Sequence, residues 1–245
     1  MPPCRFCHGE WDAEHRCTAR QLVDKNDPQS AVTERQALCG FDISVFVDSI
    51  DWGAAIASTA ARFAFIECVR GIEPGDYFNE VWKSRGVTLV CGPYQRIIST
   101  ASGKEHAEVF IQTVTTAGYL STDLPPVLDV EPDPNGNSAE PAVYIALMND
   151  WTLAIQNRLH RRPIIYTDPS FWAYLGEPAQ FGGFPLWIAH TNVPNPHVPH
   201  PWTHYDFWQY QQEVHIGGVS KPVDLDLFNG EATALEAVIE SSLVA

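Results

Sequence analysis

Short apolar runs alternate with amphipathic segments along the chain from residue 39 onward. Runs rich in β-branched and aromatic residues predict strands at 39–47, 62–69, 87–94, 125–131, 162–167, 184–190, 205–211 and 223–228. Helical periodicity predicts helices between the earlier strands, at 52–61, 76–86, 103–117 and 139–160. Strands that alternate with helices of about 10–15 residues indicate βαβ units and a parallel sheet.

The helix at 139–160 has the clearest pattern. Its apolar residues recur every four positions, which predicts one buried stripe made of Val143, Leu147, Trp151, Ile155 and Leu159. Ser138 is the expected cap, with Pro141 in the first turn. Gly86 and Gly118 follow two other predicted helices, at the position where helices commonly end.

Eight predicted strands in a chain of 245 residues favour a single α/β barrel, irregular on the side where the last three strands lack full helices between them. Residues 1–36 differ from the rest, because they are polar and carry three of the six cysteines. We interpret 1–36 as an appended Cys/His-rich arm with a linker, and 37–245 as the barrel.

Acidic residues stand at or near the ends of several predicted strands. The run "PPVLDVEP" at 125–132 delivers Asp129 and Glu131, and Pro132 terminates the strand. Residues two apart on a strand point to the same side, with Cα atoms roughly 6.6 Å apart. In a barrel both carboxyls would face the mouth, where active sites of such barrels lie.

Asp42 in "GFDIS", and Asp224 with Asp226 in "VDLDLF", could reach the same mouth. Two carboxyls in close contact push their pKa values apart, so that one can hold a proton while the other stays an anion. Cleavage of a glycosidic bond needs this combination of a proton donor and a stabilising carboxylate. The alternative is that each acid is a helix cap or a surface charge.

The motifs between Gly40 and Gly230 resemble, in order and spacing, those of the glycoside hydrolase family 25 muramidases, the Chalaropsis-type lysozymes. They are "GFDIS…IDW", "FAFIECVRG", "GVTLVCGPYQ", "PPVLDVEP", "PIIYTDPSFW", "PLWIAH", "FWQYQ" and "VDLDLFNG". The resemblance implies a TIM-like β/α barrel with five βα units and three further strands. It also implies hydrolysis of the β-1,4 bond between N-acetylmuramic acid and N-acetylglucosamine in peptidoglycan, with no cofactor for catalysis.

The resemblance also implies a role for each residue of the site. Glu131 matches the general acid/base, and Asp129 matches the carboxylate that assists the N-acetyl group of the substrate as internal nucleophile, which would retain the configuration of the sugar. Asp42 and Asp224 match the two other acids. The expected lining of the sugar cleft comprises Tyr94, Tyr166, Trp187, Gln209 and Asp226.

Four positions depart from the family pattern. Glu67 and Arg70 stand where the family usually has Lys and Glu, so an ion pair could survive in reverse. Gln95 follows the cleft tyrosine where many members have His. Asp226 takes a place often held by Asn and adds negative charge near Asp224.

The N-terminal segment "CRFCHGEWDAEHRC" has the pattern C-x2-C-x7-H-x-C. Thiolates and imidazole are good Zn²⁺ ligands, so Cys4, Cys7, His15 and Cys17 could form a structural zinc site, with His8 as a competing ligand. A polar arm with free thiols is the alternative. We expect the remaining cysteines, at 39, 68 and 91, to act as small buried apolar residues.

The formal net charge of −15 and the pI of about 4.8 disfavour nucleic acid and anionic lipid as partners. No stretch reaches the roughly 18 apolar residues of a membrane helix, and the first residues contain no apolar core of a signal peptide. We therefore expect synthesis in the cytoplasm and action on bacterial peptidoglycan after release by lysis, or after delivery with the components of a phage or injection particle.

Two other function classes stay open from the sequence. The barrel could be a non-catalytic wall-binding or structural module of such a particle. It could also be a metal-dependent polysaccharide deacetylase that uses His200 and His204, although this H-x-x-x-H pair lies in a Pro-rich loop. Acyl-transfer and nucleotide motifs such as G-x-S-x-G or a phosphate loop do not occur.

Overall fold

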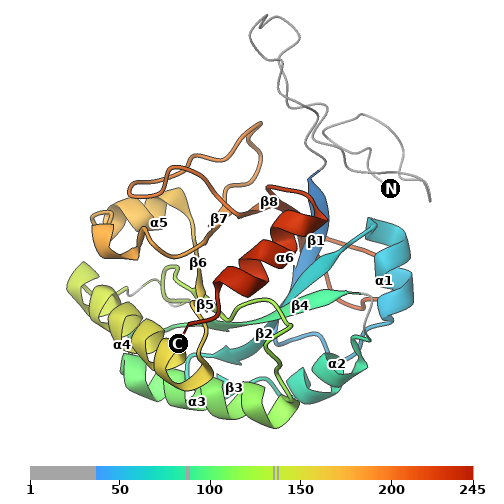
Figure 1. Ribbon diagram of the computed structural model, residues 1–245, viewed down its shortest axis with the longest axis horizontal. Coiled ribbons are helices and arrows are strands. Elements are labelled where there is room, and N and C mark those ends of the chain that lie inside the picture. Colours follow the sequence, from blue (N-terminus) through green and yellow to red (C-terminus); the bar gives the residue numbers. More distant parts are fainter. Residues whose placement is uncertain (1–36, 87–88, 135, 137, 245) are drawn as a thin grey trace, which may run out of the picture.

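Eight strands close into a barrel with helices around it in the computed structural model, which describes residues 37–86, 89–134, 136 and 138–244 (Figure 1). The barrel strands are β1 (Leu38–Ile43), β2 (Phe63–Arg70), β4 (Val90–Arg96), β5 (Val127–Asp129), β6 (Ile164–Thr167), β7 (Leu186–Ala189), β8 (Phe207–Val214) and β9 (Val223–Phe228). The pairing of β1 with both β2 and β9 closes the ring. A two-residue strand, β3 (Glu73–Pro74), pairs with the end of β2. The prediction of an eight-stranded α/β barrel is confirmed.

The direction of β9 differs from that of the other barrel strands. Neighbouring strands of the barrel from β1 to β8 pair in parallel, whereas β9 runs antiparallel to both β8 and β1. The parallel sheet expected from the sequence therefore ends at β8. As a consequence the first residues of β9 lie at the mouth where the other strands end, and Asp224 pairs directly with Asp42 of β1.

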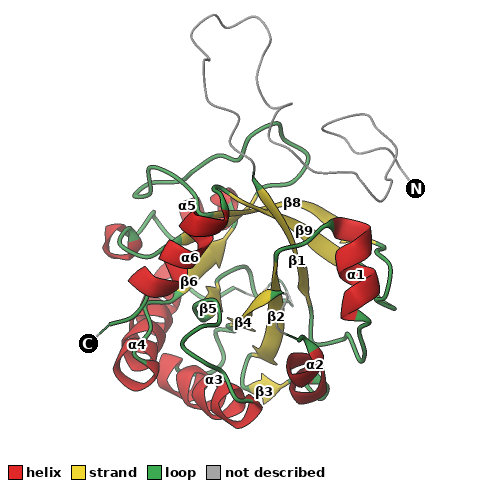
Figure 2. Cartoon of the chain, turned by 45° about the vertical axis from the view of Figure 1, so that its right-hand side comes forward, coloured by secondary structure: helices red, strands yellow, loops and turns green. Residues whose placement is uncertain are grey.

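The helices lie around the outside of the barrel (Figure 2). They are α1 (Trp52–Thr59), α2 (Phe78–Ser84), α3 (Gly103–Ala117), α4 (Pro141–Leu159), α5 (Pro169–Tyr174) and α6 (Ala232–Ser241), with a short 3₁₀ helix at Ala179–Phe181. The bounds of α3 agree with the prediction because Ser102 and Glu105 form a capping box at its start, and Gly118 ends it at φ 82°.

The start and the buried face of α4 differ in part from the prediction. Pro141 occupies the first turn as expected, but the N-cap is Glu140, and the Ser138 hydroxyl accepts a hydrogen bond from the backbone of Asp133 instead. Of the predicted stripe, Leu147, Trp151 and Ile155 are buried, whereas Val143 is exposed. Tyr144, Met148 and Thr152 complete the buried face, because 3.6 residues per turn shift it away from a strict spacing of four.

Helices α5 and α6 were not anticipated from the sequence. Helix α5 has six residues, capped by the Asp168 carboxylate. Helix α6 packs across the barrel end opposite the mouth, since Leu235 and Ile239 share a cavity with Leu38 and Val90, which begin β1 and β4. It therefore covers the floor of the barrel.

Aromatic side chains fill the barrel interior. Phe65 stacks on Trp187 with ring centroids 4.2 Å apart, and Phe63 meets Phe207 edge to face at 5.2 Å. A Cβ atom at Gly40 would lie 2.4 Å from the Phe63 ring, so β1 needs a glycine there. The interior is thus a packed core, and the space open to a ligand lies above it at the mouth.

The predicted zinc ligands Cys4, Cys7, His15 and Cys17 lie outside the described residues. Among the other cysteines, Cys68 and Cys91 are buried as expected and Cys39 is half-buried. Within residues 37–244, gaps aside, no helix is long and apolar enough to cross a lipid bilayer.

Candidate active site

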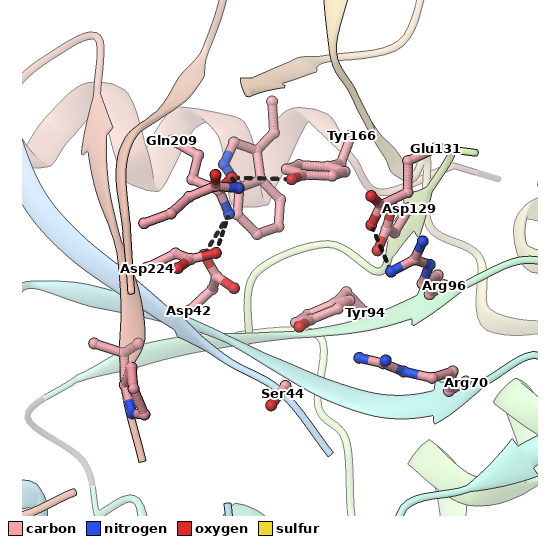
Figure 3. Close-up of a pocket in the computed structure, with 14 residues that line it drawn as sticks. Asp42, Ser44, Arg70, Tyr94, Arg96, Asp129, Glu131, Tyr166, Gln209 and Asp224 are labelled. Atoms are coloured by element: carbon pink, nitrogen blue, oxygen red, sulfur yellow. Dashed lines mark hydrogen bonds and ion pairs between the residues drawn. The ribbon is translucent and has the colours of Figure 1, made fainter. Parts of the chain in front are cut away.

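A cavity of about 250 Å³ opens at the barrel mouth (Figure 3). Its lining includes the four acids predicted for the site, Asp42, Asp129, Glu131 and Asp224. It also includes four of the five predicted cleft residues, which are Tyr94, Tyr166, Trp187 and Gln209. Six further residues complete the lining: Ser44, Arg70, Arg96, Gln212, Pro222 and Val223.

The carboxyls of Asp129 and Glu131 lie side by side at the end of β5. Asp129 is the last residue of the strand and is 4% exposed, whereas Glu131 follows two residues later and is more open. Arg96 Nη1 lies 3.2 Å from Glu131 Oε1, and Arg96 Nη2 donates to the backbone oxygen of Pro132 at 2.8 Å. One guanidinium group therefore holds the segment that carries the second acid.

Burial and proximity set the protonation of this pair. Burial raises the pKa of Asp129 well above its ordinary value, and the neighbouring Glu131 raises it further. Burial also raises the pKa of Glu131, although Arg96 opposes the shift. Two carboxyls in this setting retain a shared proton at a higher pH than isolated acids do.

Gln209 organises the opposite wall of the cavity. Its Nε2 donates to Asp42 Oδ2 at 2.9 Å and to Asp224 Oδ2 at 3.2 Å. Its Oε1 accepts from the hydroxyl of Tyr166 at 3.0 Å and from Gln212 at 3.1 Å. The amide thus joins two acids to the aromatic wall. Burial, followed by the charge of Asp224, raises the pKa of Asp42 well above its ordinary value.

The structure places Asp226 behind the cavity wall, which corrects its expected position in the cleft lining. Asp226 is fully buried, and the indole Nε1 of Trp187 donates to its Oδ1 at 2.9 Å. Burial and the charge of Asp42 raise the pKa of Asp226 well above its ordinary value. Its contact therefore orients Trp187 from below.

The ion pair expected between Glu67 and Arg70 is present. Arg70 Nε and Nη2 donate to the two Glu67 oxygens at 2.8 and 2.7 Å, and the backbone nitrogen of Val45 donates to Glu67 Oε2 at 3.0 Å. The exchanged charges therefore still make a forked contact. In addition they tie the end of β2 to the loop after β1.

Gln95 and Arg96 face opposite sides of β4. The Gln95 side chain accepts from Trp151 Nε1 at 2.6 Å and donates to the Gly71 oxygen at 2.7 Å, so it packs toward α4 and away from the cavity. Arg96 faces the cavity together with Tyr94, two residues earlier. Sequence reasoning did not single out Arg96 as a site residue, although strand alternation from Tyr94 could have indicated it.

His200 and His204, the pair considered for a deacetylase, lie in the loop before β8, where the oxygen of His200 accepts a bond from Trp172 Nε1 at 2.8 Å. In the part of the chain that the structure describes, no three His, Cys, Asp or Glu side chains are grouped so that they could hold a metal ion. The acids of the cavity are instead separated into the two walls described above.

Comparison with known proteins agrees with this geometry. Residues 41–219 match the family model "Glycosyl hydrolases family 25". The chain is 30% identical to lysozyme M1 of Streptomyces globisporus, over 83% of this chain and 71% of that protein. It is 29% identical to the N,O-diacetylmuramidase of Chalaropsis sp, over 73% of this chain and 90% of that protein.

A crystal structure of the bacterial lysozyme from Streptomyces coelicolor superposes with a TM-score of 0.76 at 29% identity, covering 83% of this chain and 97% of the other. Three findings agree with one another: a barrel that the antiparallel strand β9 closes, a mouth lined by acids, and the match to the family model. The chain therefore belongs to glycosyl hydrolase family 25.

Proposed function

We propose that the protein is a muramidase, which hydrolyses the β-1,4 bond between N-acetylmuramic acid and N-acetylglucosamine in bacterial peptidoglycan. The observation that carries the proposal is the Asp129–Glu131 pair at the end of β5, which faces a cavity walled by Tyr94, Tyr166 and Trp187. Aromatic side chains in a cavity wall suit contact with the apolar surface of sugar rings. Membership of family 25 and relatives named lysozyme and N,O-diacetylmuramidase support the same activity.

In this proposal Glu131 protonates the glycosidic oxygen as the bond to the leaving sugar breaks. Asp129 is then the anion that holds the N–H of the substrate N-acetyl group, whose carbonyl oxygen attacks the anomeric carbon. Glu131 next takes a proton from the water that opens this intermediate. Two displacements at one carbon retain its configuration.

Asp42 and Asp224 have a different part in the proposal. Gln209 fixes both carboxyls on the wall opposite Glu131, at 2.9 and 3.2 Å from its amide nitrogen. From there they would accept hydrogen bonds from the substrate and stabilise the positive charge that develops on the sugar. No step of the proposal uses a metal or an organic cofactor.

Replacement of Glu131 by Gln tests the proposal, because the amide keeps the shape but cannot pass a proton. We expect the rate of formation of new reducing ends on purified peptidoglycan to fall about 10²–10⁴-fold. Asp129→Asn should also lose activity, and the two losses should not add because both groups serve one transition state. Glu108→Gln, an exposed glutamate of α3 that pairs with Arg158, is the matched control.

Three results would contradict the proposal. Unchanged cleavage by Glu131→Gln would mean that the proton donor is another group. Acetate release that chelators abolish, without new reducing ends, would indicate the deacetylase. Binding of the parent protein to peptidoglycan without any reducing ends would indicate a non-catalytic wall-binding module.

A further inference from the structure

Two arginines, Arg70 and Arg96, line the cavity on the side of Glu131 and Asp129 (Figure 3). Arg70 ends β2 and Arg96 ends β4, and the two residues pair in the strand register. Burial raises the pKa of Glu131, and the charges of both guanidinium groups oppose this rise. The cavity is therefore divided into an acidic wall at Asp42 and Asp224 and a wall where positive and negative groups alternate.

Each arginine is held in place and still reaches the cavity. The fork of Arg70 with Glu67 uses Nε and Nη2, its side chain is 31% exposed, and its guanidinium carbon lies 4.9 Å from the ring centroid of Phe46. Arg96 is anchored through Nη2 to the Pro132 oxygen, and its Nη1 meets Glu131. Its side chain is 17% exposed.

The contact between Arg96 and Glu131 conflicts with the role of a proton donor. An acid that protonates a leaving oxygen must hold its proton, whereas an adjacent guanidinium favours the anion. Once Glu131 is protonated, Arg96 loses its nearest negative partner and keeps only the charge of Asp129, with which it makes no ion pair, and a partly buried cation that loses a close carboxylate is less stable. A substrate that supplies another anion for Arg96 would remove both difficulties.

We propose that Arg96, supported by Arg70, binds a carboxylate carried by the muramic acid of the substrate, and that this carboxylate replaces Glu131 as the partner of Arg96. The inference rests on the proposed muramidase function. It assigns to the two arginines a binding subsite that prefers an acidic substituent on the sugar. Binding at this subsite then prepares Glu131 for proton donation.

The chemistry of the substrate fits the subsite. Muramic acid carries a lactyl ether two carbons from the anomeric carbon, close to the bond that breaks. Its acid group is free where the stem peptide is absent, and where the peptide is present a glutamate carboxylate follows within a few bonds. A planar carboxylate matches the planar guanidinium donors.

The groups that face Glu131 give the sign of the pH effect. They are Arg96 from β4, Arg70 from β2, Asp129 from β5 and Asp168 after β6. Both arginine charges oppose the rise in the pKa of Glu131, whereas Asp168 supports it. A carboxylate that occupies Arg96 should therefore let the pKa of Glu131 rise, which extends activity to higher pH.

Defined tetrasaccharides of alternating N-acetylglucosamine and N-acetylmuramic acid test the proposal. One pair compares the free lactyl acid with its methyl amide, and a second compares a lactyl-linked L-Ala-D-Glu with its diamide. For the parent protein we expect the charged member of at least one pair to have a kcat/KM about 10- to 100-fold higher, as for a charge-assisted hydrogen bond. The pair that shows this preference identifies the source of the carboxylate.

Arg96→Gln should bring that ratio close to one, and on the neutral substrate it should move the alkaline limb of the pH profile upward. Arg158→Gln, which removes an exposed arginine of α4, should leave ratio and profile unchanged. Arg96→Lys keeps the charge without the fork and should retain part of the ratio. If Arg96→Gln does not fold, the pH profile of the parent protein still tests the proposal. Its kcat should stay high to a higher pH on the charged substrate than on the neutral one.

Equal kcat/KM within both pairs for the parent protein would overturn the subsite, as would an undiminished ratio in Arg96→Gln. An alkaline limb of kcat that is the same for charged and neutral substrates would overturn the exchange of partners. Failure of the parent protein to cleave any of the four compounds or peptidoglycan would instead reject the muramidase function. Failure of the carboxylate subsite and failure of the muramidase function therefore give different results.

Discussion

Glu67 and Arg70 form an ion pair whose two members differ in burial. The Glu67 side chain has no exposed surface, whereas Arg70 is 31% exposed. Loss of the arginine therefore leaves a buried carboxylate whose remaining hydrogen bond comes from the backbone of Val45. The loss in free energy of unfolding therefore depends on which partner of the pair is replaced.

We expect Arg70→Met to lower the free energy of unfolding by about 3 kcal/mol, at the low end for breaking a buried pair because Arg70 is partly exposed. Adding Glu67→Gln should recover part of this loss, since a neutral amide can still accept from Val45 and costs less to bury. Urea unfolding of the two single variants and the double variant measures the cycle. A double variant less stable than Arg70→Met would contradict this account.

Residue types and strand alternation identified the acids of the site and most of its aromatic wall, because these positions follow from local sequence alone. They did not show that Asp226 is buried behind Trp187, since Asp224 and Asp226 share one side of their strand and differ only in what lies above them. Alternation from Tyr94 could have indicated that Arg96 faces the cavity, but the contact of Arg96 with Glu131 depends on the neighbouring strand. Such contacts between strands are properties of the folded barrel.

At the scale of elements, α3 shows how local signals define a helix. Ser102 Oγ accepts from the backbone nitrogen of Glu105 at 3.2 Å, and the Glu105 carboxylate accepts from the backbone of Ser102 at 2.9 Å. We expect Ser102→Ala to lower the free energy of unfolding by about 1 kcal/mol, and Ser102→Gly by only about 0.3 kcal/mol. Denaturant unfolding compares them, and equal stability of parent and alanine variant would show that the cap contributes nothing.

Helix α3, which has capping residues at both ends, was predicted with its correct bounds, whereas the short helix α5 and the last helix α6 were missed. Helix α5 begins with the capping signal Asp168 and Pro169. Its six residues are too few to show a helical period in the sequence. The end of β1 was placed four residues late, because the apolar run continues to Val47 although the strand ends at Ile43. The direction of β9 has no local signal, since a strand reads the same in either orientation.

At the scale of the molecule, five buried or half-buried carboxyls make stability depend on pH. The pKa values of Asp42, Asp129, Glu131, Asp224 and Asp226 are all raised, mainly by burial. Between their unfolded values, 3.8 for Asp and 4.5 for Glu, and these raised values, the folded protein binds more protons than the unfolded chain. The contribution of these groups to the free energy of unfolding is fully present below their unfolded-state pKa values, and it is lost as the pH rises through the raised pKa values of the folded protein.

We therefore expect the melting temperature to be higher near pH 5 than near pH 8, with Asp226→Asn flattening this dependence. The asparagine cannot ionise, so the variant should gain on the parent at pH 8 and lose that advantage toward pH 4. Thermal unfolding followed by circular dichroism measures both proteins across this range. Parallel curves for parent and variant would mean that Asp226 ionises as easily in the folded protein as in the unfolded chain.

The closure of the ring by β9 also determines when during synthesis the protein can become active. Gln209 joins Asp42 across 167 residues of sequence, and Asp224 reaches the same mouth only when β9 pairs with β1. While β9 is still inside the ribosome, a nascent chain lacks Asp224 in the wall that Gln209 and Asp42 share, and its ring stays open between β8 and β1. Contacts this distant in sequence carry a large entropic cost of loop closure, which slows their formation. An unfinished or prematurely terminated chain therefore lacks one acid of the site, and we expect hydrolase activity only from chains that contain β9.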